Sequence, residues 1–172
     1  AKPEEATPTS KLADYVEDGQ IIVLLPGTLG TLVFVEAFRK KGVAKDVIIA
    51  ETNTNSYDAR VLEPGYAYVY KINAPLQLGV FPAARTKEAI DKLQGIYNFV
   101  PVEDILEAAF HSHNPVSHTP ACIMSVSRIE RSKGEFYLYE EAFGPTVCRV
   151  TKMLDNERIA VAKAYGYHPL TI

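Results

Sequence analysis

Three of the four histidines of the chain lie within the eleven residues FHSHNPVSHTP, from Phe110 to Pro120. Imidazole side chains bind metal ions or transfer protons near neutral pH. A zinc-type site needs two ligands on one helix face, or closely spaced histidines completed by a carboxylate or a cysteine. His111, His113 and His118 lie in a proline-interrupted stretch without such a partner close by. We therefore expect no metal site here.

His118 differs from the other two histidines because it follows Asn114 by four residues. One helical turn would bring both side chains to the same face, with Pro115 at the first helical position and Asn114 as the N-cap. A histidine that projects from a first turn beside an interdomain cleft is suited to proton transfer. The spacing alone favours a simpler interpretation, an interface histidine whose hydrogen bonds are satisfied.

Helical and strand patterns alternate in the first part of the chain. Two apolar runs suit strands that are covered on both faces. The expected elements are a short helix from residue 9 or 10 that Gly19 closes, a strand Ile21–Leu25, a helix Thr31–Gly42 and a strand Val47–Ala50. This order is typical of a parallel α/β sheet with crossover helices.

The pattern changes after Tyr57. Two strands, Tyr66–Ile72 and Leu76–Phe81, are expected, joined by a short turn at Asn73-Ala74-Pro75. The expected helices are one capped at Thr86, one within VPVEDILEAAFHS and, beyond the histidine segment, Ala121–Arg131 and Pro145–Tyr165. The alternation of strands and helices thus gives way to helices alone near residue 111.

Two loops follow predicted strands, at the edge of an open α/β sheet where ligands bind. In PGTLGT, from Pro26 to Thr31, backbone N–H groups and the following helix N-terminus could hold a phosphate or another anion. The loop lacks GxGxxG spacing, and a tight strand-to-helix turn explains its two glycines equally well. The polar side chains of ETNTNSYDAR, from Glu51 to Arg60, could meet a cofactor or substrate, or could cap local turns.

Charge and hydropathy exclude several classes of protein. The 172 residues carry a net charge of -3, and Arg39, Lys40 and Lys41 form the only tight basic cluster, so nucleic acid is not an expected partner. No apolar run approaches the roughly 18 residues of a membrane span, and no leader is recognisable, so no membrane association is expected. Cys122 and Cys148 are too few for a disulfide framework. We expect a cytoplasmic protein.

Three segments together resemble the NAD/NADP octopine/nopaline (opine) dehydrogenase family. They are DGQIIVLLPGTLGT, NPVSHTP and EEAFGPTVCRVTKMLDNERIAVAKAYGY. In order and spacing they are similar to the strand and PG loop of that family's dinucleotide-binding domain, to the NxxxH segment that starts its helical substrate domain, and to the long helix that follows. The resemblance implies an α/β fold. Residues 1–110 would be the C-terminal part of a Rossmann-type dinucleotide-binding domain, and residues 111–172 the start of an all-α substrate domain.

The resemblance also implies roles for individual residues. His118 would be the catalytic acid/base, with Asn114 beside it in the substrate site. Tyr57 and His113 would contact the substrate. Cofactor contacts would come from the two loops, at Pro26, Gly27, Thr28, Gly30, Glu51 and Thr52. The cofactor would be NAD or NADP, and the substrates would be small molecules, an amino acid and a 2-oxo acid whose imine receives a hydride.

The chain departs from the family in lacking the GxGxxG turn and the acidic residue that holds a ribose. It is therefore expected to be an internal segment of a longer dehydrogenase, one that alone binds cofactor poorly. Two other functions stay open. One is a related 2-oxo or hydroxy acid dehydrogenase without an amine partner. The other is a non-catalytic binding or assembly module whose helical part forms a homodimer interface.

Overall fold

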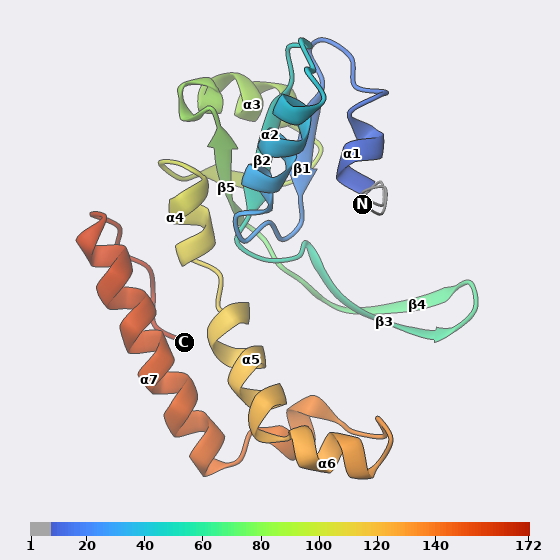
Figure 1. The fold of residues 1–172 in the computed structure, drawn as a ribbon, viewed down its shortest axis with the longest axis vertical. Coiled ribbons are helices and arrows are strands. Elements are labelled where there is room, and N and C mark those ends of the chain that lie inside the picture. The colour runs from blue at the N-terminus through green and yellow to red at the C-terminus, as the bar shows by residue number, and fades with distance from the viewer. Residues whose placement is uncertain (1–7) are drawn as a thin grey trace, which may run out of the picture. The chain divides into compact units, whose positions relative to one another are not determined.

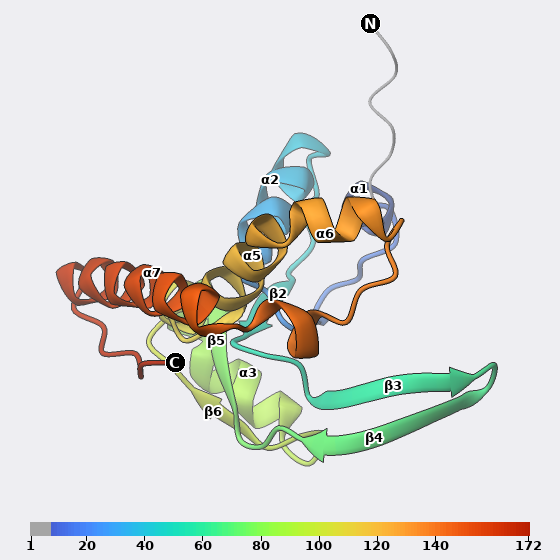
Figure 2. The ribbon, with the colours of Figure 1, turned by 90° about the horizontal axis from the view of Figure 1, so that it is seen from below.

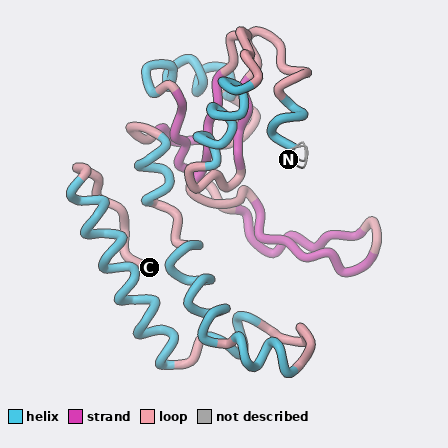
Figure 3. The backbone as a smooth tube through the Cα atoms, viewed as in Figure 1, coloured by secondary structure: helices cyan, strands magenta, loops and turns pink. Residues whose placement is uncertain are grey.

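The structure is a computed structural model that describes residues 8–172. The chain folds into two compact units, one ending at Ala109 and one running from Phe110 to Ile172. The first unit contains strands and helices, and the second contains helices and loops (Figure 3). None of the described helices is both long and apolar enough to cross a membrane.

A four-stranded mixed sheet forms the centre of the first unit (Figure 1). Its strands are β1 (Ile21–Leu24), β2 (Ile48–Thr52), β5 (Leu76–Phe81) and β6 (Phe99–Pro101), in the order β1-β2-β5-β6. β1 and β2 are parallel, with Ile21 opposite Ile48, and β5 and β6 are also parallel. β2 and β5 are antiparallel, with Glu51 opposite Gly79. The parallel pairing expected for the two strands of the alternating part is therefore confirmed in β1 and β2, and the complete sheet is mixed.

The antiparallel pair follows from the connection between β2 and β5. A parallel neighbour needs a crossover, usually a helix, that carries the chain back to the end of the sheet where the first strand began. Here the chain leaves β2 and enters a hairpin of β3 (Tyr57–Glu63) and β4 (Tyr66–Ile72) (Figures 1 and 2). The hairpin returns the chain to the end of the sheet where β2 finishes, so β5 runs antiparallel to β2. Both strands expected after residue 65 are present, but they do not pair with each other. β4 pairs with β3, which forms in a segment expected to be a polar loop.

Helices cover both faces of the sheet. They are α1 (Pro8–Leu12), α2 (Gly30–Lys40), the 3₁₀ turn η1 (Ala83–Arg85), α3 (Thr86–Leu93) and α4 (Ile105–Phe110). Successive residues of β2 point to opposite faces. Ile48 and Ala50 pack with Leu93 of α3 on one face. Ile49 packs with Phe38 of α2 on the other face, so every position of β2 is buried.

The start of α3 differs from the expected capping at Thr86. Arg85 occupies the N-cap position, and the Thr86 hydroxyl donates to the Ala83 carbonyl at 2.7 Å. The Arg85 guanidinium donates instead to the carboxylates of Glu88 and Asp46. Hydrogen bonds from Arg85, and then from a lysine one turn further along α3, lower the pKa of Glu88 to about 2. The N-cap of α3 therefore has no side-chain hydrogen bond, and a partly exposed charge network lies beside its first turn.

The second unit is helical, and an α/β part followed by helices is confirmed as the fold. Its elements are α5 (Asn114–Met124), α6 (Val126–Arg131), the short π-helical segment η2 (Leu138–Ala142) and α7 (Pro145–Ala164). α5 packs against α7 and η2 around Ala121 and Val147. The stretch expected to be a loop up to Pro120 is helical from Asn114 onward. Pro115 lies in the first turn, where a backbone N–H would have no partner within the helix. Pro120 lies inside the helix, and its ring is buried.

Candidate functional site

Asn114 and His118 lie one helical turn apart on α5, the spacing that places them on one face. The helix begins one residue earlier than expected. His113 is the N-cap and Asn114 is already helical, so the expectation that Asn114 caps the helix is wrong. The reason lies in the backbone, because the His113 carbonyl accepts hydrogen bonds from the amides of Val116 and Ser117, at 3.2 and 3.0 Å. The Asn114 and His118 side chains are both half-buried.

The imidazole of His118 is held by Tyr139, a residue that the sequence patterns did not single out. The His118 Nε2 lies 2.9 Å from the Tyr139 hydroxyl, in hydrogen-bond contact, and the two rings meet edge to face with 5.8 Å between centroids. A hydroxyl both donates and accepts, so this bond is possible whether or not Nε2 carries a proton. Tyr139 in turn stacks on Phe143, with 8° between the ring planes. Two aromatic contacts thus fix the orientation of His118.

Apolar neighbours bring Tyr139 to α5. In η2 and just after it, Leu138, Ala142 and Phe143 pack with Ala121 of α5. Tyr139 itself remains 60% exposed, so the histidine and tyrosine pair is open to solvent on one side. The segment FYLYEEAF shows aromatic and acidic residues ahead of α7, but Tyr139 is 21 residues from its partner and no local spacing relates them.

A buried ion pair on α7 ties together segments of the second unit. The side chains of Asp155 and Arg158 are only 3% and 7% exposed, and the Arg158 Nη2 donates to the Asp155 Oδ1 at 2.7 Å. Arg158 also donates to the carbonyl oxygens of Phe110 and Leu170. The amide of Ile172 donates to the second Asp155 oxygen at 2.9 Å. One charged pair therefore connects α7 to the residues that precede α5 and to those that follow α7.

The balance of forces on Asp155 favours its charged form. Burial raises the pKa of Asp155, but hydrogen bonds from Ile172 and Arg158, with the charges of Arg158 and His113, outweigh burial. The pKa of Asp155 therefore lies below its ordinary value of 3.8. The Nε2 of His113 also lies 3.4 Å from the Leu170 carbonyl, which places this histidine beside the buried pair. Its role in substrate binding stays a prediction.

In the first unit, the loop from Pro26 to Thr31 binds an anion that belongs to the chain itself. Glu51 of β2 is fully buried, and its carboxylate accepts hydrogen bonds from the amides of Leu29 at 2.7 Å and Thr31 at 3.0 Å. These amides lie at the start of α2, where the helix dipole stabilises negative charge. The Glu51 carboxylate thus occupies two of the amides that the sequence offered for a phosphate or another anion. The role of the loop toward a cofactor stays a prediction.

Two glycines let the loop close over this carboxylate. A Cβ at Gly27 would overlap the Glu51 side chain, and a Cβ at Gly30 would lie 2.7 Å from a side-chain carbon of β1. The Gly27 amide donates to the carbonyl of Thr52, another fully buried residue, at 3.1 Å. The predicted cofactor residues Glu51 and Thr52 thus turn inward and shape the loop. Thr28 is exposed on its outer side.

Tyr57, predicted to contact substrate, is the first residue of β3. Its ring meets that of Tyr97 edge to face, with 5.9 Å between centroids, and remains 49% exposed. The Tyr97 hydroxyl lies 2.9 and 2.7 Å from the carbonyl oxygens of Ser56 and Asn73, which precede β3 and follow β4 at the base of the hairpin. Desolvation raises the pKa of Tyr97. The contacts of Tyr57 are therefore structural, and its role toward substrate stays a prediction.

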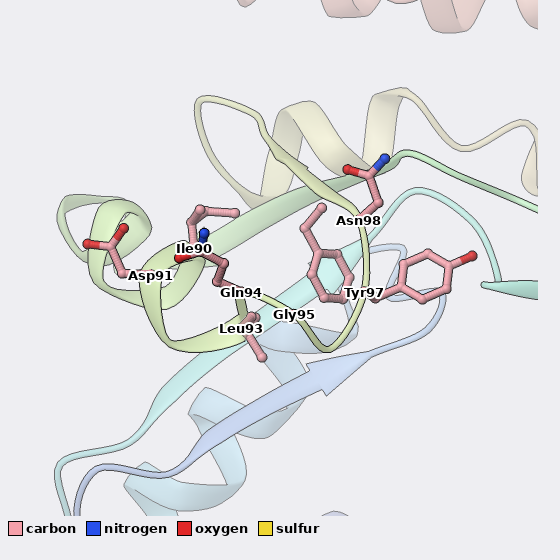
Figure 4. Close-up of a pocket in the computed structure, with 8 residues that line it drawn as sticks. Ile90, Asp91, Leu93, Gln94, Gly95, Tyr97 and Asn98 are labelled. Atoms are coloured by element: carbon pink, nitrogen blue, oxygen red, sulfur yellow. The ribbon is translucent and has the colours of Figure 1, made fainter.

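Two hollows lie apart from the predicted residues. One, of about 370 Å³, lies in the first unit between Ile90 and Phe99, where α3 ends (Figure 4). The other, of about 540 Å³, lies in the second unit beside Asp155. The Thr151 hydroxyl there is buried without a hydrogen-bond partner in the described part of the chain. His118 lines neither hollow. Among residues 8–172, no group of three histidine, cysteine or acidic side chains could hold a metal ion.

Solved structures define the class of the fold. A yersinopine dehydrogenase with NADP⁺ bound matches 88% of this chain with a TM-score of 0.67 and 16% identity, and the match covers 39% of that structure. Octopine dehydrogenase with NADH and L-arginine matches 91% of this chain with a TM-score of 0.58 and 20% identity, over 40% of that structure. The fold is therefore the C-terminal part of a Rossmann-type domain followed by the start of a helical domain, as predicted.

Sequence comparison adds two similarities. Residues 101–172 match the α-helical domain of NAD/NADP octopine/nopaline dehydrogenase. The opine dehydrogenase of Arthrobacter sp. strain 1C is 32% identical over 162 residues, which are 93% of this chain and 45% of that protein. The resemblance to the octopine/nopaline dehydrogenase family is thereby confirmed. The chain spans less than half the length of these relatives.

Replacing Glu51 tests the internal anion. In Glu51→Gln the side chain keeps its shape, but its NH₂ group faces one of the two amides that donate to the carboxylate in the wild type. Two donors then face each other, and one hydrogen bond is lost. We expect the free energy of unfolding of the full-length protein to fall by roughly 2 kcal/mol, the scale of a lost hydrogen bond to a charged group. Denaturant unfolding measures this loss. The control is Glu36→Gln, an exposed acid on α2, and equal stability of both variants would contradict the capping role.

The buried pair on α7 predicts an acid-dependent stability. The pKa of Asp155 is lower in the folded chain than its ordinary value of 3.8, so its contribution is fully present above about pH 4. That contribution is lost as the pH falls through the lower, folded value. Asp155→Asn should cost about 3 kcal/mol near pH 7, because it leaves the buried charge of Arg158 uncompensated.

Thermal unfolding across pH 2 to 7 measures the difference in stability between wild type and Asp155→Asn. This difference in stability should narrow on the acid side and stay constant between pH 5 and 7. Glu157→Gln, an exposed neighbour on α7, should leave the profile unchanged. A gap that does not vary with pH would show that the carboxylate charge of Asp155 is not the stabilising feature.

Proposed function

We propose that the chain is part of an NAD- or NADP-dependent opine dehydrogenase, which condenses an amino acid with a 2-oxo acid and reduces the resulting imine. The observation that carries the proposal is the position of the Asn114 and His118 turn. It lies inside residues 101–172, which match the family's α-helical domain, and its imidazole is oriented by Tyr139. We assign residues 1–110 to the dinucleotide-binding domain and residues 111–172 to the start of the substrate domain.

In this proposal His118 is the proton-transfer group. Imine formation removes the carbonyl oxygen of the oxo acid as water, and an imidazole can donate and recover the proton that this step needs. The 2.9 Å contact with Tyr139 fixes the ring while leaving it half-buried. Asn114, one turn earlier on α5, would orient the substrate through its amide. His113 and Tyr57 are proposed as further substrate contacts.

The loop at the end of β1 fits the uncharged or cationic part of a dinucleotide. The amides of Leu29 and Thr31 are occupied by the Glu51 carboxylate, whose charge disfavours a pyrophosphate there. A carboxylate below the loop instead favours a nicotinamide ring, which is cationic when oxidised. Pro26 and the exposed Thr28 would contact the ring, over a surface that Gly27, Gly30 and Thr52 shape together with Glu51. The bound cofactor would supply the hydride for the imine carbon.

The two cysteines bear on the cellular compartment in which the proposed enzyme acts. Cys122 and Cys148 are free and exposed. Exposed free thiols suit a reducing compartment, and we propose that the enzyme acts in the cytoplasm on small molecules. No nucleic acid or membrane enters the proposed reaction.

The full-length protein is tested by following the oxidation of NADH or NADPH with a 2-oxo acid, with and without a panel of amino acids. Turnover that requires the amino acid supports the opine reaction, and equal turnover without it supports a 2-oxo acid dehydrogenase. Absence of turnover with every combination would favour a binding or assembly module. In the same assay His118→Ala should reduce kcat by at least about a hundredfold, the usual contribution of a general acid/base.

Cofactor binding separates the proton-transfer role of His118 from a structural one. Nucleotide affinity of His118→Ala, measured by fluorescence titration, should stay within about twofold of wild type, since His118 lies outside the unit that carries the cofactor loop. The control is His168→Ala, an exposed histidine elsewhere, which should keep full activity. Loss of cofactor affinity in His118→Ala would remove the catalytic assignment.

Tyr139 is expected to position His118. Tyr139→Phe keeps the stack on Phe143 and removes only the hydroxyl that contacts Nε2. We expect kcat to fall about three- to tenfold with KM nearly unchanged, because a hydrogen bond of roughly 1 kcal/mol is lost at the proton-transfer group and not at the substrate. Tyr137→Phe, an exposed tyrosine two residues away, is the matched control. An unchanged kcat, or a change in KM alone, would contradict the positioning role.

A further inference from the structure

The hollow beside Asp155 follows two turns of α7. Thr151 and Asp155, four residues apart, are buried and form its floor. Cys148, Lys152 and Asn156 follow one another at the same spacing, are exposed and form its rim. Residues four apart lie on one face of a helix, so the two rows run side by side over roughly 12 Å. The volume of about 540 Å³ is within the range of small-molecule sites.

Both ends of the hollow are closed by chain that flanks α7. Phe143 lies at the end near Cys148, whose Sγ donates to the Phe143 carbonyl at 3.5 Å. Beyond α7 the chain turns back along the helix (Figure 1), and Thr171 and Ile172 line the hollow near Asp155. The Ile172 amide holds this segment by its hydrogen bond to the Asp155 carboxylate. Contacts within the second unit therefore fix the walls.

The Thr151 hydroxyl on the floor of the hollow lacks a partner. The side chain is 6% exposed, and its oxygen forms no hydrogen bond within residues 8–172. Buried hydroxyls are nearly always hydrogen-bonded, because an unsatisfied one has lost the hydration that it has in the unfolded chain. An acceptor that enters the hollow would satisfy this hydroxyl.

The rim supplies a cation and an amide. Lys152 is exposed and forms no ion pair with any described residue, and the Asn156 amide lies one turn further along α7. Asp155 does not oppose an anion here, because its two oxygens already accept from Arg158 and from the Ile172 amide. The lysine, the amide and the Thr151 hydroxyl can all donate hydrogen bonds, as an anion requires.

Apolar groups make up much of the remaining lining. The Phe143 ring is half-buried, and Ile172 and Thr171 add aliphatic groups. Among the described residues that line the hollow, Asp155 is the only acid. A carboxylate with an apolar body matches this combination of donors and apolar walls. An inorganic phosphate would leave the apolar wall uncovered.

We infer that the hollow binds a small carboxylic acid with an apolar body, in its carboxylate form. The two carboxylate oxygens accept hydrogen bonds from Lys152 and from the Thr151 hydroxyl. The apolar body lies on Phe143 and Ile172 and removes their exposed surface from water. The inference rests on the lining of the hollow and not on the proposed dehydrogenase reaction.

The inferred site is separate from His118, which does not line the hollow. The two are nevertheless connected through one ring, because Phe143 also stacks on Tyr139, whose hydroxyl contacts His118 Nε2. A bound acid therefore lies against the ring that supports the histidine and tyrosine pair.

Binding is measured by isothermal titration calorimetry of the full-length protein with 4-methylpentanoate. This probe has a branched apolar body and a carboxylate, and it lacks the amino and oxo groups of the proposed substrates. We expect a dissociation constant of about 1 mM or lower, within reach of a ligand of this size. The amide 4-methylpentanamide has the same shape without the charge. It should bind at least about tenfold more weakly, the scale of a hydrogen bond to a charged group.

Four variants identify the residues that hold the probe. Lys152→Met should weaken binding about fivefold, the upper range of an exposed ion pair, and Lys163→Met, an exposed lysine of α7 outside the hollow, should not. Thr151→Val keeps the shape and removes the hydroxyl, so it should weaken binding about fivefold without lowering the stability of the free protein. His118→Ala should bind the probe as wild type does.

Thiol protection locates the probe. Cys148 lies on the rim, and Cys122 on α5 is exposed outside the hollow. Mass spectrometry follows the modification of each thiol by iodoacetamide. With the probe at about ten times its dissociation constant, labelling of Cys148 should slow about tenfold by mass action, and labelling of Cys122 should not change.

Several results would overturn the inference. One is a full-length protein that does not bind 4-methylpentanoate, or whose Cys148 is inaccessible because the remainder of the chain fills the hollow. Another is equal affinity for the amide or in Lys152→Met, since the anion would then play no part. Loss of binding in His118→Ala would place the probe at the proposed catalytic site instead. Because these measurements do not use turnover, they stand apart from the proposed function.

Discussion

The buried pair of Asp155 and Arg158 holds the segment that leads into the helix with the candidate histidine. Burying two charges is costly unless hydrogen bonds satisfy them, and here backbone groups do so: Arg158 donates to the Phe110 carbonyl, and Asp155 accepts from the Ile172 amide. The chain that enters α5 and the chain that leaves α7 are therefore held by the same two side chains. The approach of the chain to α5 thus depends on a charge balance located on a different helix.

The first unit uses a buried carboxylate in the same way. Glu51 accepts from two amides at the start of α2 and so fixes the loop that follows β1. Gly27 is required because its Cα passes directly over the Glu51 side chain. In both units an internal anion organises backbone groups that would otherwise be free to bind something else. For this reason the amides of Leu29 and Thr31, in the loop Pro26–Thr31 (the PG loop), are part of the scaffold.

Local patterns predicted β1, α2 and α7, since each depends mainly on the periodicity of its own residues. They failed where a partner distant in sequence decides. The antiparallel pairing of β5 depends on the missed strand β3, and the occupancy of the PG loop depends on Glu51, 20 or more residues away. The Asn114 and His118 turn could be predicted because both residues are on one helix. Tyr139 could not, because packing of η2 and not spacing brings it to His118.

The position of Glu51 also constrains which part of a dinucleotide each region can bind. A helix N-terminus attracts phosphate only while its amides and its partial positive charge are uncompensated. With a buried carboxylate at α2, the loop has no free positive field to offer an anion, and a second negative group placed there would be repelled. In the proposed enzyme, the charged pyrophosphate would therefore be held by residues other than Pro26–Thr31. The loop would there select shape and an uncharged or cationic ring, and a Gly27 substitution would alter that selection through the carboxylate beneath it.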